Sequence, residues 1–154
     1  MKDKRSLLWF KNELRLHDNE ILFRAATKAT FVLPVYIIDP AQFQPGKLGF
    51  PKTNFFRTQF LLESLASLKT SLQKAEADLH VFVGRAEEII PQLVRELRFT
   101  IVYASQEVGS EELMTQYAVE MQLKKVGVPL ELLWQNTLYH ADDIPWPIQR
   151  LPDT

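Results

Sequence analysis

The sequence predicts an α/β fold: a five-stranded, doubly wound parallel sheet with strand order 3-2-1-4-5 and helices on both faces. Short apolar runs alternate with longer segments in which apolar residues recur at every third or fourth position. Connections of about 10 to 20 residues require parallel pairing, because each must return the chain to the same edge of the sheet. The runs are continuous, as expected for strands that helices cover on both sides. The predicted topology is therefore Rossmann-like.

Five short apolar runs give the predicted strands. The second run contains Pro34, which cannot donate a ladder hydrogen bond, so we expect regular pairing to begin there. A long loop with several glycines and prolines, residues 41–53, follows this run. The predicted strands are Leu7–Phe10, Phe31–Ile38, Leu79–Val83, Phe99–Ala104 and Pro129–Trp134.

Four helices are predicted between these strands. Asp18 and Asn19 are both good N-caps for the first helix, and Asp18 is the expected cap. Asn54 is expected to cap the second helix, and Ser110 the fourth, which runs to residue 126.

Apolar spacing predicts the face that each of the longer helices turns to the sheet. The second helix is expected to pack through Phe56, Phe60, Leu61, Leu65, Leu68 and Leu72. The third, Ala86–Leu97, is expected to pack through Ile89, Ile90, Leu93, Val94 and Leu97, with Pro91 near its first turn, where proline is tolerated. The fourth groups Met114, Tyr117, Ala118 and Met121 on one face.

Composition excludes several function classes. A net charge of −1 argues against non-specific nucleic-acid binding, which needs a cationic excess. Without cysteine there is no disulfide or thiolate site, and the three histidines lack a zinc-ligand spacing, so we assign no metal. The apolar run near the N-terminus is too short for a signal peptide or a membrane span. We therefore expect a cytoplasmic protein without membrane contact.

The predicted strand order places a topological switch between the first and fourth strands, where ligands bind outside the carboxyl ends. Those ends are Phe10–Asn12 and Ala104–Glu107. The loop after the first strand contains no glycine, so it does not resemble the phosphate cradle of a dinucleotide-binding domain.

The polar residues of that first loop are expected to be structural. Arg15 is interpreted as a surface tether and His17 as a hydrogen-bonded loop residue, since no nucleophile partners it at a recognisable spacing. The neighbouring carboxylates Asp142 and Asp143 are interpreted as turn formers rather than metal ligands. No catalytic residue is assigned.

The chain after the fifth predicted strand has a different composition and no helical pattern. Residues 136–154 contain Trp146 and several prolines without helical periodicity. We therefore expect an α/β domain over residues 1–135 and the start of an interdomain connector over residues 136–154, with a second domain absent from this chain.

The order of these segments resembles the N-terminal α/β domain of the photolyase/cryptochrome family, most closely its DASH cryptochrome branch. The family opening is matched by Leu8–Phe10 and Arg15–Asn19. The other matching segments are Lys47–Thr53, Phe56–Arg57, Phe60–Leu65, Glu107–Val108, Trp134, Thr137–His140, Asp142–Asp143, Ile148–Gln149 and Leu151–Asp153.

The resemblance implies a flavoprotein that drives DNA repair with light, as a deoxyribodipyrimidine photolyase-type lyase, or that signals in blue light. In such a protein a C-terminal helical domain holds FAD and contacts DNA, and the α/β domain supports an antenna chromophore, often methenyl-tetrahydrofolate. This chain alone is expected to carry no cofactor and no catalysis. Trp9, Trp134 and Trp146 are not assigned the electron-transfer role of that other domain.

Glu107 is the main candidate for antenna binding. It matches the acid that contacts the antenna in the family, and a carboxylate can accept two hydrogen bonds from the adjacent amino and N–H groups of a pterin. Gln106 takes the place of a polar neighbour often found there. Residue position alone also allows Glu107 to be a solvated loop carboxylate.

Two other functions stay open at this point. One is a stand-alone nucleotide-binding enzyme of the same topology, although Gly109 and Gly127 do not form the glycine-rich phosphate loop it would need. The other is an interaction domain that has lost its chromophore.

Overall fold

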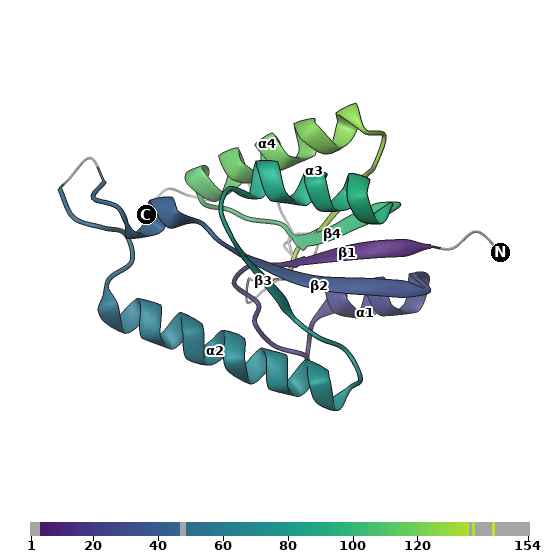
Figure 1. Ribbon diagram of the computed structural model, residues 1–154, viewed down its shortest axis with the longest axis horizontal. Coiled ribbons are helices and arrows are strands. Elements are labelled where there is room, and N and C mark those ends of the chain that lie inside the picture. Colours follow the sequence, from purple (N-terminus) through teal and green to yellow (C-terminus); the bar gives the residue numbers. More distant parts are fainter. Residues whose placement is uncertain (1–3, 47–48, 136, 138–142, 144–154) are drawn as a thin grey trace.

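A computed structural model describes residues 4–46, 49–135, 137 and 143 (Figure 1). Five parallel strands form one sheet in the order β3-β2-β1-β4-β5, which confirms the predicted topology. The strands are Arg5–Phe10 (β1), Phe31–Ile38 (β2), His80–Val83 (β3), Ile101–Ser105 (β4) and Leu130–Leu133 (β5). The helices are Glu20–Lys28 (α1), Phe55–Lys74 (α2), Ala86–Leu97 (α3) and Ser110–Lys125 (α4), with a 3-10 turn at Pro40–Phe43 (η1).

The sheet separates two apolar cores, because alternate residues of each strand point to opposite faces. In β1, Leu7 and Trp9 pack with α3 and α4, whereas Leu8 and Phe10 pack with α1 and α2. Figure 1 shows α3 and α4 on one side of the sheet and α1 and α2 on the other. Helices cover both faces, as the continuous apolar runs predicted.

The second strand begins earlier than expected. Pro34 lies inside β2 and is paired in register with Leu8 of β1. The neighbouring β3 pairs with β2 only from Val35 onward, so β2 has an edge at Pro34 on that side. Proline is tolerated there because no neighbouring strand on that side needs a hydrogen bond from its missing N–H group.

The prediction that Asp18 caps α1 is wrong. Asn19 occupies the N-cap position, and its side chain accepts a hydrogen bond from Leu22 N at 3.1 Å. Asp18 has a φ of 49°, and its carboxylate pairs with Arg15. From the end of β5, Gln135 Oε1 accepts hydrogen bonds from the first two α1 amides, Glu20 N at 2.9 Å and Ile21 N at 3.3 Å.

The face predicted for α2 is only partly right. Leu65, Leu68 and Leu72 are buried, but Phe56 and Phe60 are 79% and 72% exposed. Figure 1 shows the first turns of α2 extending past the end of the sheet, so their side chains have no strand to pack on. Helical spacing alone does not tell where the sheet ends.

The face predicted for α4 differs as well. The buried residues are Gln116, Val119 and Leu123, whereas Met114 and Tyr117 are exposed. Gly109, not Ser110, occupies the N-cap position. Gln116 can occupy a buried position because its side-chain amide is hydrogen-bonded at the candidate site. A prediction based on apolar residues alone therefore did not find this face.

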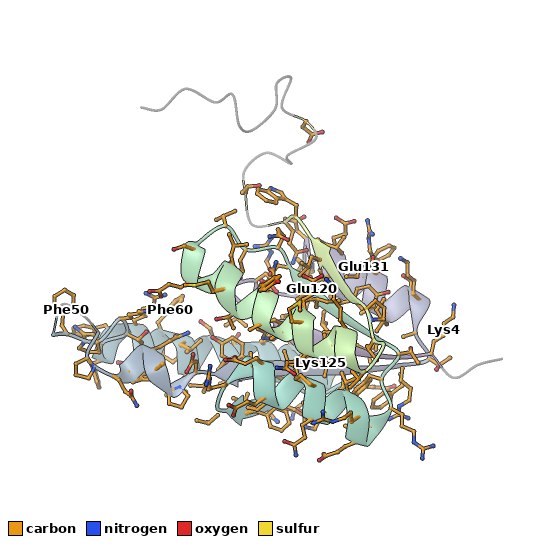
Figure 2. The ribbon with its side chains drawn as sticks, turned by 90° about the horizontal axis from the view of Figure 1, so that it is seen from above. Lys4, Phe50, Phe60, Glu120, Lys125 and Glu131 are labelled. Atoms are coloured by element: carbon orange, nitrogen blue, oxygen red, sulfur yellow. The ribbon has the colours of Figure 1, made fainter. Side chains whose placement is uncertain are left out.

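In α3 the predicted face holds through Ile90 and Val94, which are buried, while Leu97 at the end of the helix is 39% exposed. Pro91 lies in the second turn rather than the first, where it is buried. Figure 2 shows the side chains of the molecule from above, with Glu120 and Lys125 on the outer side of α4.

Candidate functional site

Glu107 follows β4 at the switch point and is 8% exposed. Its backbone N–H donates to Gln116 Oε1 of α4 at 3.3 Å. Its carboxylate Oε1 accepts a long hydrogen bond from Asn12 Nδ2 at 3.4 Å. The carboxylate is therefore fixed between the ends of β1 and β4 rather than solvated.

Lys11 supplies the counter-charge for this carboxylate. Its Nζ lies 4.0 Å from Glu107 Oε1 and donates to Ser105 O at 2.8 Å and Gln116 Oε1 at 3.1 Å. The ammonium also lies 4.5 Å from the centroid of the Trp9 ring, within the range of a cation–π interaction. One side chain thus joins β1, β4 and α4.

Burial changes the proton affinity of both members of this pair. It lowers the pKa of Lys11 to about 8, although Glu107 and Glu13 oppose the shift. Burial raises the pKa of Glu107, and the charge of Lys11 opposes that rise. Burial thus disfavours the charged form of each residue, and the opposite charge of its partner offsets part of that cost.

A second buried carboxylate supports the end of β1. Glu13 is 2% exposed, and its Oε2 accepts a 2.7 Å hydrogen bond from Ser105 Oγ. Its Oε1 accepts a 3.2 Å bond from Lys11 N. Glu13 therefore locks the turn that carries Lys11 onto β4.

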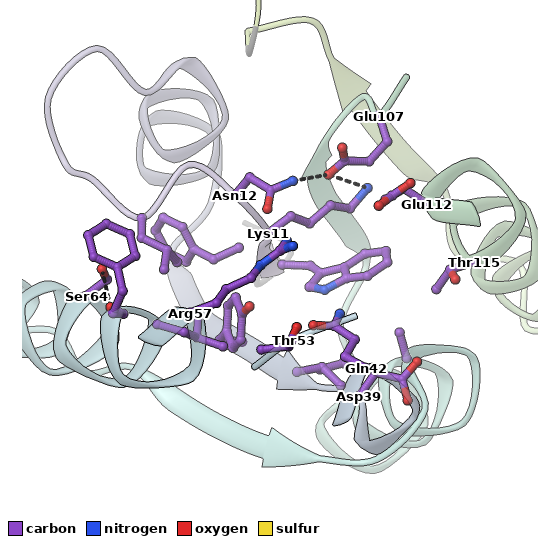
Figure 3. A pocket seen from close by; sticks show the side chains of 18 residues that line it. Lys11, Asn12, Asp39, Gln42, Thr53, Arg57, Ser64, Glu107, Glu112 and Thr115 are labelled. Atoms are coloured by element: carbon purple, nitrogen blue, oxygen red, sulfur yellow. Dashed lines mark hydrogen bonds and ion pairs between the residues drawn. The ribbon is translucent and has the colours of Figure 1, made fainter. Parts of the chain in front are cut away.

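The described residues Lys11, Asn12 and Glu107 line a cavity of about 330 Å³ at the carboxyl ends of the strands. Figure 3 shows this cavity, with Lys11 and Asn12 next to Glu107. Its other lining residues are Trp9, Phe10, Leu14, Tyr36, Ile37, Asp39, Gln42, Thr53, Arg57, Phe60, Leu61, Ser64, Ala86, Glu112 and Thr115. The arrangement offers a buried carboxylate, an indole and apolar walls to a flat ligand with hydrogen-bond donors.

Gln106 has a different position from that of Glu107. Its Oε1 accepts from Gln116 Nε2 at 3.3 Å, and its Nε2 donates to Glu107 O at 2.9 Å. It is not among the described residues that line the cavity. Gln106 holds the loop in place, so its predicted contact with a cofactor stays a prediction.

The polar loop residues after β1 form local contacts. Arg15 Nε and Nη2 donate to the backbone oxygens of His17 and Asp18 at 3.0–3.2 Å, and the pair Arg15–Asp18 is exposed. None of these three residues belongs to the described lining of the cavity.

The described residues contain no group of three or more His, Cys, Asp or Glu side chains that could hold a metal ion. Across the same part of the chain, no helix is both long and apolar enough to cross a membrane. Apart from Thr137 and Asp143, the predicted connector of residues 136–154, including Asp142 and Trp146, lies outside the described residues.

A family model described as DNA photolyase matches residues 6–154. The chain belongs to the DNA photolyase family. It is 42% identical over 153 residues to cryptochrome DASH of Gloeobacter violaceus, covering 99% of this chain and 31% of that protein. It is 41% identical over 147 residues to the blue-light photoreceptor PHR2 of Arabidopsis thaliana, covering 96% and 33%.

A solved structure of Synechocystis sp. PCC6803 cryptochrome superimposes with a TM-score of 0.92 at 39% identity, covering 100% of this chain and 32% of that one. The chain spans about a third of the length of these relatives and corresponds to the N-terminal α/β domain of photolyase- and cryptochrome-like proteins. Members of this family are flavoproteins. The family and the DASH resemblance inferred from the motifs are confirmed.

Sequence reasoning missed Lys11 and Arg57 as site residues. Lys11 directly follows a buried strand at the switch point, the same signal that selected Glu107. Arg57 comes from a helix distant in sequence, and only the folded chain shows that it lines the same cavity.

Proposed function

We propose that this chain is the antenna-chromophore-binding domain of a photolyase- or cryptochrome-type flavoprotein, and that Glu107 binds the pterin ring of a reduced folate such as methenyl-tetrahydrofolate. The observation that carries this proposal is a buried carboxylate, held in place by hydrogen bonds, in a 330 Å³ cavity at the topological switch. A flat ligand with adjacent donors suits such a site.

The residues around Glu107 suit a ligand that donates hydrogen bonds. Lys11 and Asn12 both contact Oε1, and within the described part of the chain no side chain donates to Oε2. An ionised carboxylate then offers acceptor capacity to an amino group and a ring N–H together. The Trp9 ring and the apolar residues Leu14 and Leu61 line the same cavity, where they can pack against a flat ring.

The role of the bound pterin would be to absorb light and pass excitation to a flavin held by another domain. The chain itself would bind and orient the pterin without catalysing a reaction. FAD, DNA contact and photolyase chemistry would belong to a C-terminal helical domain, consistent with a chain that matches about a third of its relatives.

Titration of the purified chain with methenyl-tetrahydrofolate tests the proposal, followed through the near-ultraviolet absorbance of the ligand and the quenching of tryptophan fluorescence. We expect weak, saturable binding, because part of the pocket wall would come from the second domain. Glu107→Gln should weaken binding by about 10- to 100-fold, since a charge-assisted pair is worth about 1.5–3 kcal/mol. Glu96→Gln, on the exposed side of α3, is the matched control.

The same pair of variants can be placed in this chain fused to the remaining two thirds of the Gloeobacter protein. There, Glu107→Gln should lower antenna occupancy while FAD content stays unchanged. Equal antenna occupancy in the Glu107→Gln and Glu96→Gln fusions would remove Glu107 from the site.

A further inference from the structure

The geometry points to an anion-binding subsite at Arg57, separate from Glu107 within the same cavity. We propose that Arg57 binds a carboxylate or phosphate group at the far end of the ligand. This inference rests on the proposed function only in using the same cavity. It adds a requirement for the ligand: hydrogen-bond donors at one end and an anionic group at the other.

The charges that line the cavity single out Arg57. A second hollow of about 560 Å³ shares Arg57 and Thr53 with the first, so Arg57 lies at the junction of the two. Among the described cations that line either hollow, Lys11 pairs with Glu107, Lys52 with Glu111, and Arg85 with Glu87.

Arg57 differs from those cations. It forms no ion pair or hydrogen bond with another described residue through its guanidinium, although it has five donors to offer. An unpaired guanidinium that borders two connected hollows is suited to a planar anion such as a carboxylate, which it can bind through two parallel hydrogen bonds.

The local backbone adds to this positive charge. Arg57 lies in the first turn of α2, whose N-cap residue Asn54 makes no side-chain capping bond. The positive end of the helix dipole is therefore at the same turn. Figure 3 shows the Arg57 side chain extending from α2 into the cavity, toward the end of β1.

Tyr36 shows that the charge of Arg57 acts inside the cavity. Both residues line it, and burial raises the pKa of the Tyr36 hydroxyl. The positive charge of Arg57 opposes that rise. Burial and the charge of Glu13 both act against an anion at this position, so Arg57 is the group that favours one there.

The acidic residues restrict where such an anion can lie. Asp39 and Glu112 also line both hollows. Figure 3 shows both across the cavity from Arg57, and the Asp39 carboxylate accepts a bond from Ala41 N at 2.9 Å. These carboxylates would repel an anion on their side, so the α2 side is the one that accepts it.

Three probes separate the two ends of the site: methenyl-tetrahydrofolate, with a ring and a carboxylate tail; 6,7-dimethylpterin, with the ring alone; and p-aminobenzoylglutamate, with the tail alone. Each is titrated, up to about 1 mM, into the wild-type chain, Arg57→Gln, Glu107→Gln and the exposed control Arg95→Gln. Tail binding is read by competition with the folate.

Arg57→Gln should weaken binding of the folate and of the tail probe about fivefold, and leave the pterin unchanged. The effect is modest because Arg57 is exposed and water screens its charge. Raising the ionic strength should weaken folate binding more in the wild-type chain than in Arg57→Gln. Competition by inorganic phosphate against the folate, but not the pterin, would show that the subsite takes any small anion.

The outcomes distinguish this inference from the proposed function. Pterin and folate binding that depends on Glu107 but is equal in Arg57→Gln and Arg95→Gln would overturn the anion subsite alone. Tail binding that depends on Arg57, with pterin binding indifferent to Glu107, would support the subsite and overturn the proposed function. Absence of saturable binding by all three probes would overturn both.

Discussion

Lys11 Nζ lies 4.0 Å from Glu107 Oε1, and each side chain keeps only 9% of its surface exposed. The two residues come from the ends of adjacent strands, β1 and β4, on either side of the topological switch. A charge pair at this position stabilises the candidate site and makes it sensitive to pH.

Removing the cation should destabilise the fold. In Lys11→Met, Glu107 keeps its buried charge without its partner, so we expect the free energy of unfolding to fall by about 1–3 kcal/mol at pH 7. Urea denaturation measures this change. Lys125→Met, on the exposed end of α4, should stay within about 0.5 kcal/mol of wild type.

The double variant Lys11→Met/Glu107→Gln gives a second check. Neutralising Glu107 removes the uncompensated charge, so part of the loss in Lys11→Met should be recovered. Strictly additive losses in the double variant would show that the two charges do not interact.

Stability should rise with pH on the alkaline side. The Lys11 pKa is lowered from 10.5 to about 8 by burial. Between these two values the unfolded chain binds a proton that the folded chain has released, so the free energy of unfolding increases with pH. Below pH 8 both states are charged, and the cost of burying the ammonium is present in full.

Urea unfolding between about pH 7.5 and pH 9.5 should reveal this slope, which can reach about 1.4 kcal/mol per pH unit. The range stops below the titration of Tyr36 and Tyr103, whose pKa values are raised by burial and whose contribution has the opposite sign. Lys11→Met should be flat by comparison. An equal slope in that variant would assign the effect to other groups.

The buried bond between Ser105 and Glu13 should also contribute to stability. Ser105→Ala leaves Glu13 Oε2 without its 2.7 Å donor, in a place where water does not reach. We expect a loss of about 1–3 kcal/mol in thermal or urea unfolding. Ser67→Ala, on the exposed side of α2, is the matched control and should change little.

The two ends of α2 should respond differently to truncation of apolar side chains. Leu68 is 3% exposed, so Leu68→Ala should cost about 2–5 kcal/mol of unfolding free energy. Phe56 is 79% exposed, so Phe56→Ala should cost less than about 0.5 kcal/mol. Comparable losses would mean that Phe56 packs in solution as the apolar spacing first predicted.

The sheet topology was predictable because each strand is a compact apolar run and every connection is long enough to cross over. The faces that α2 and α4 bury against the sheet were not predictable in full. The apolar stripe of α2 continues beyond the sheet to Phe56, and the buried stripe of α4 contains the polar Gln116. Apolar periodicity indicates an amphipathic helix. It does not show where the sheet beneath the helix ends or which polar side chain finds hydrogen-bond partners in the core.

The candidate site was predictable only in part for a similar reason. Glu107 could be found because strand ends meet at the switch point, and that rule applies equally to Lys11. Arg57 could not, since its place depends on where the first turn of α2 lies relative to β1 and β2. The role of Gln106 depends on Gln116 of α4, a contact that no local pattern encodes.

The hydrogen bonds that Gln135 accepts from α1 determine where this α/β domain can be cut or joined to another protein. A chain shortened to residue 134 would lose the Oε1 that receives two amides of α1, whereas one shortened to residue 136 would keep it. The junction for a graft onto another protein is thus set by a helix that begins more than a hundred residues earlier. Donor segments should be joined after Gln135 so that α1 keeps both bonds.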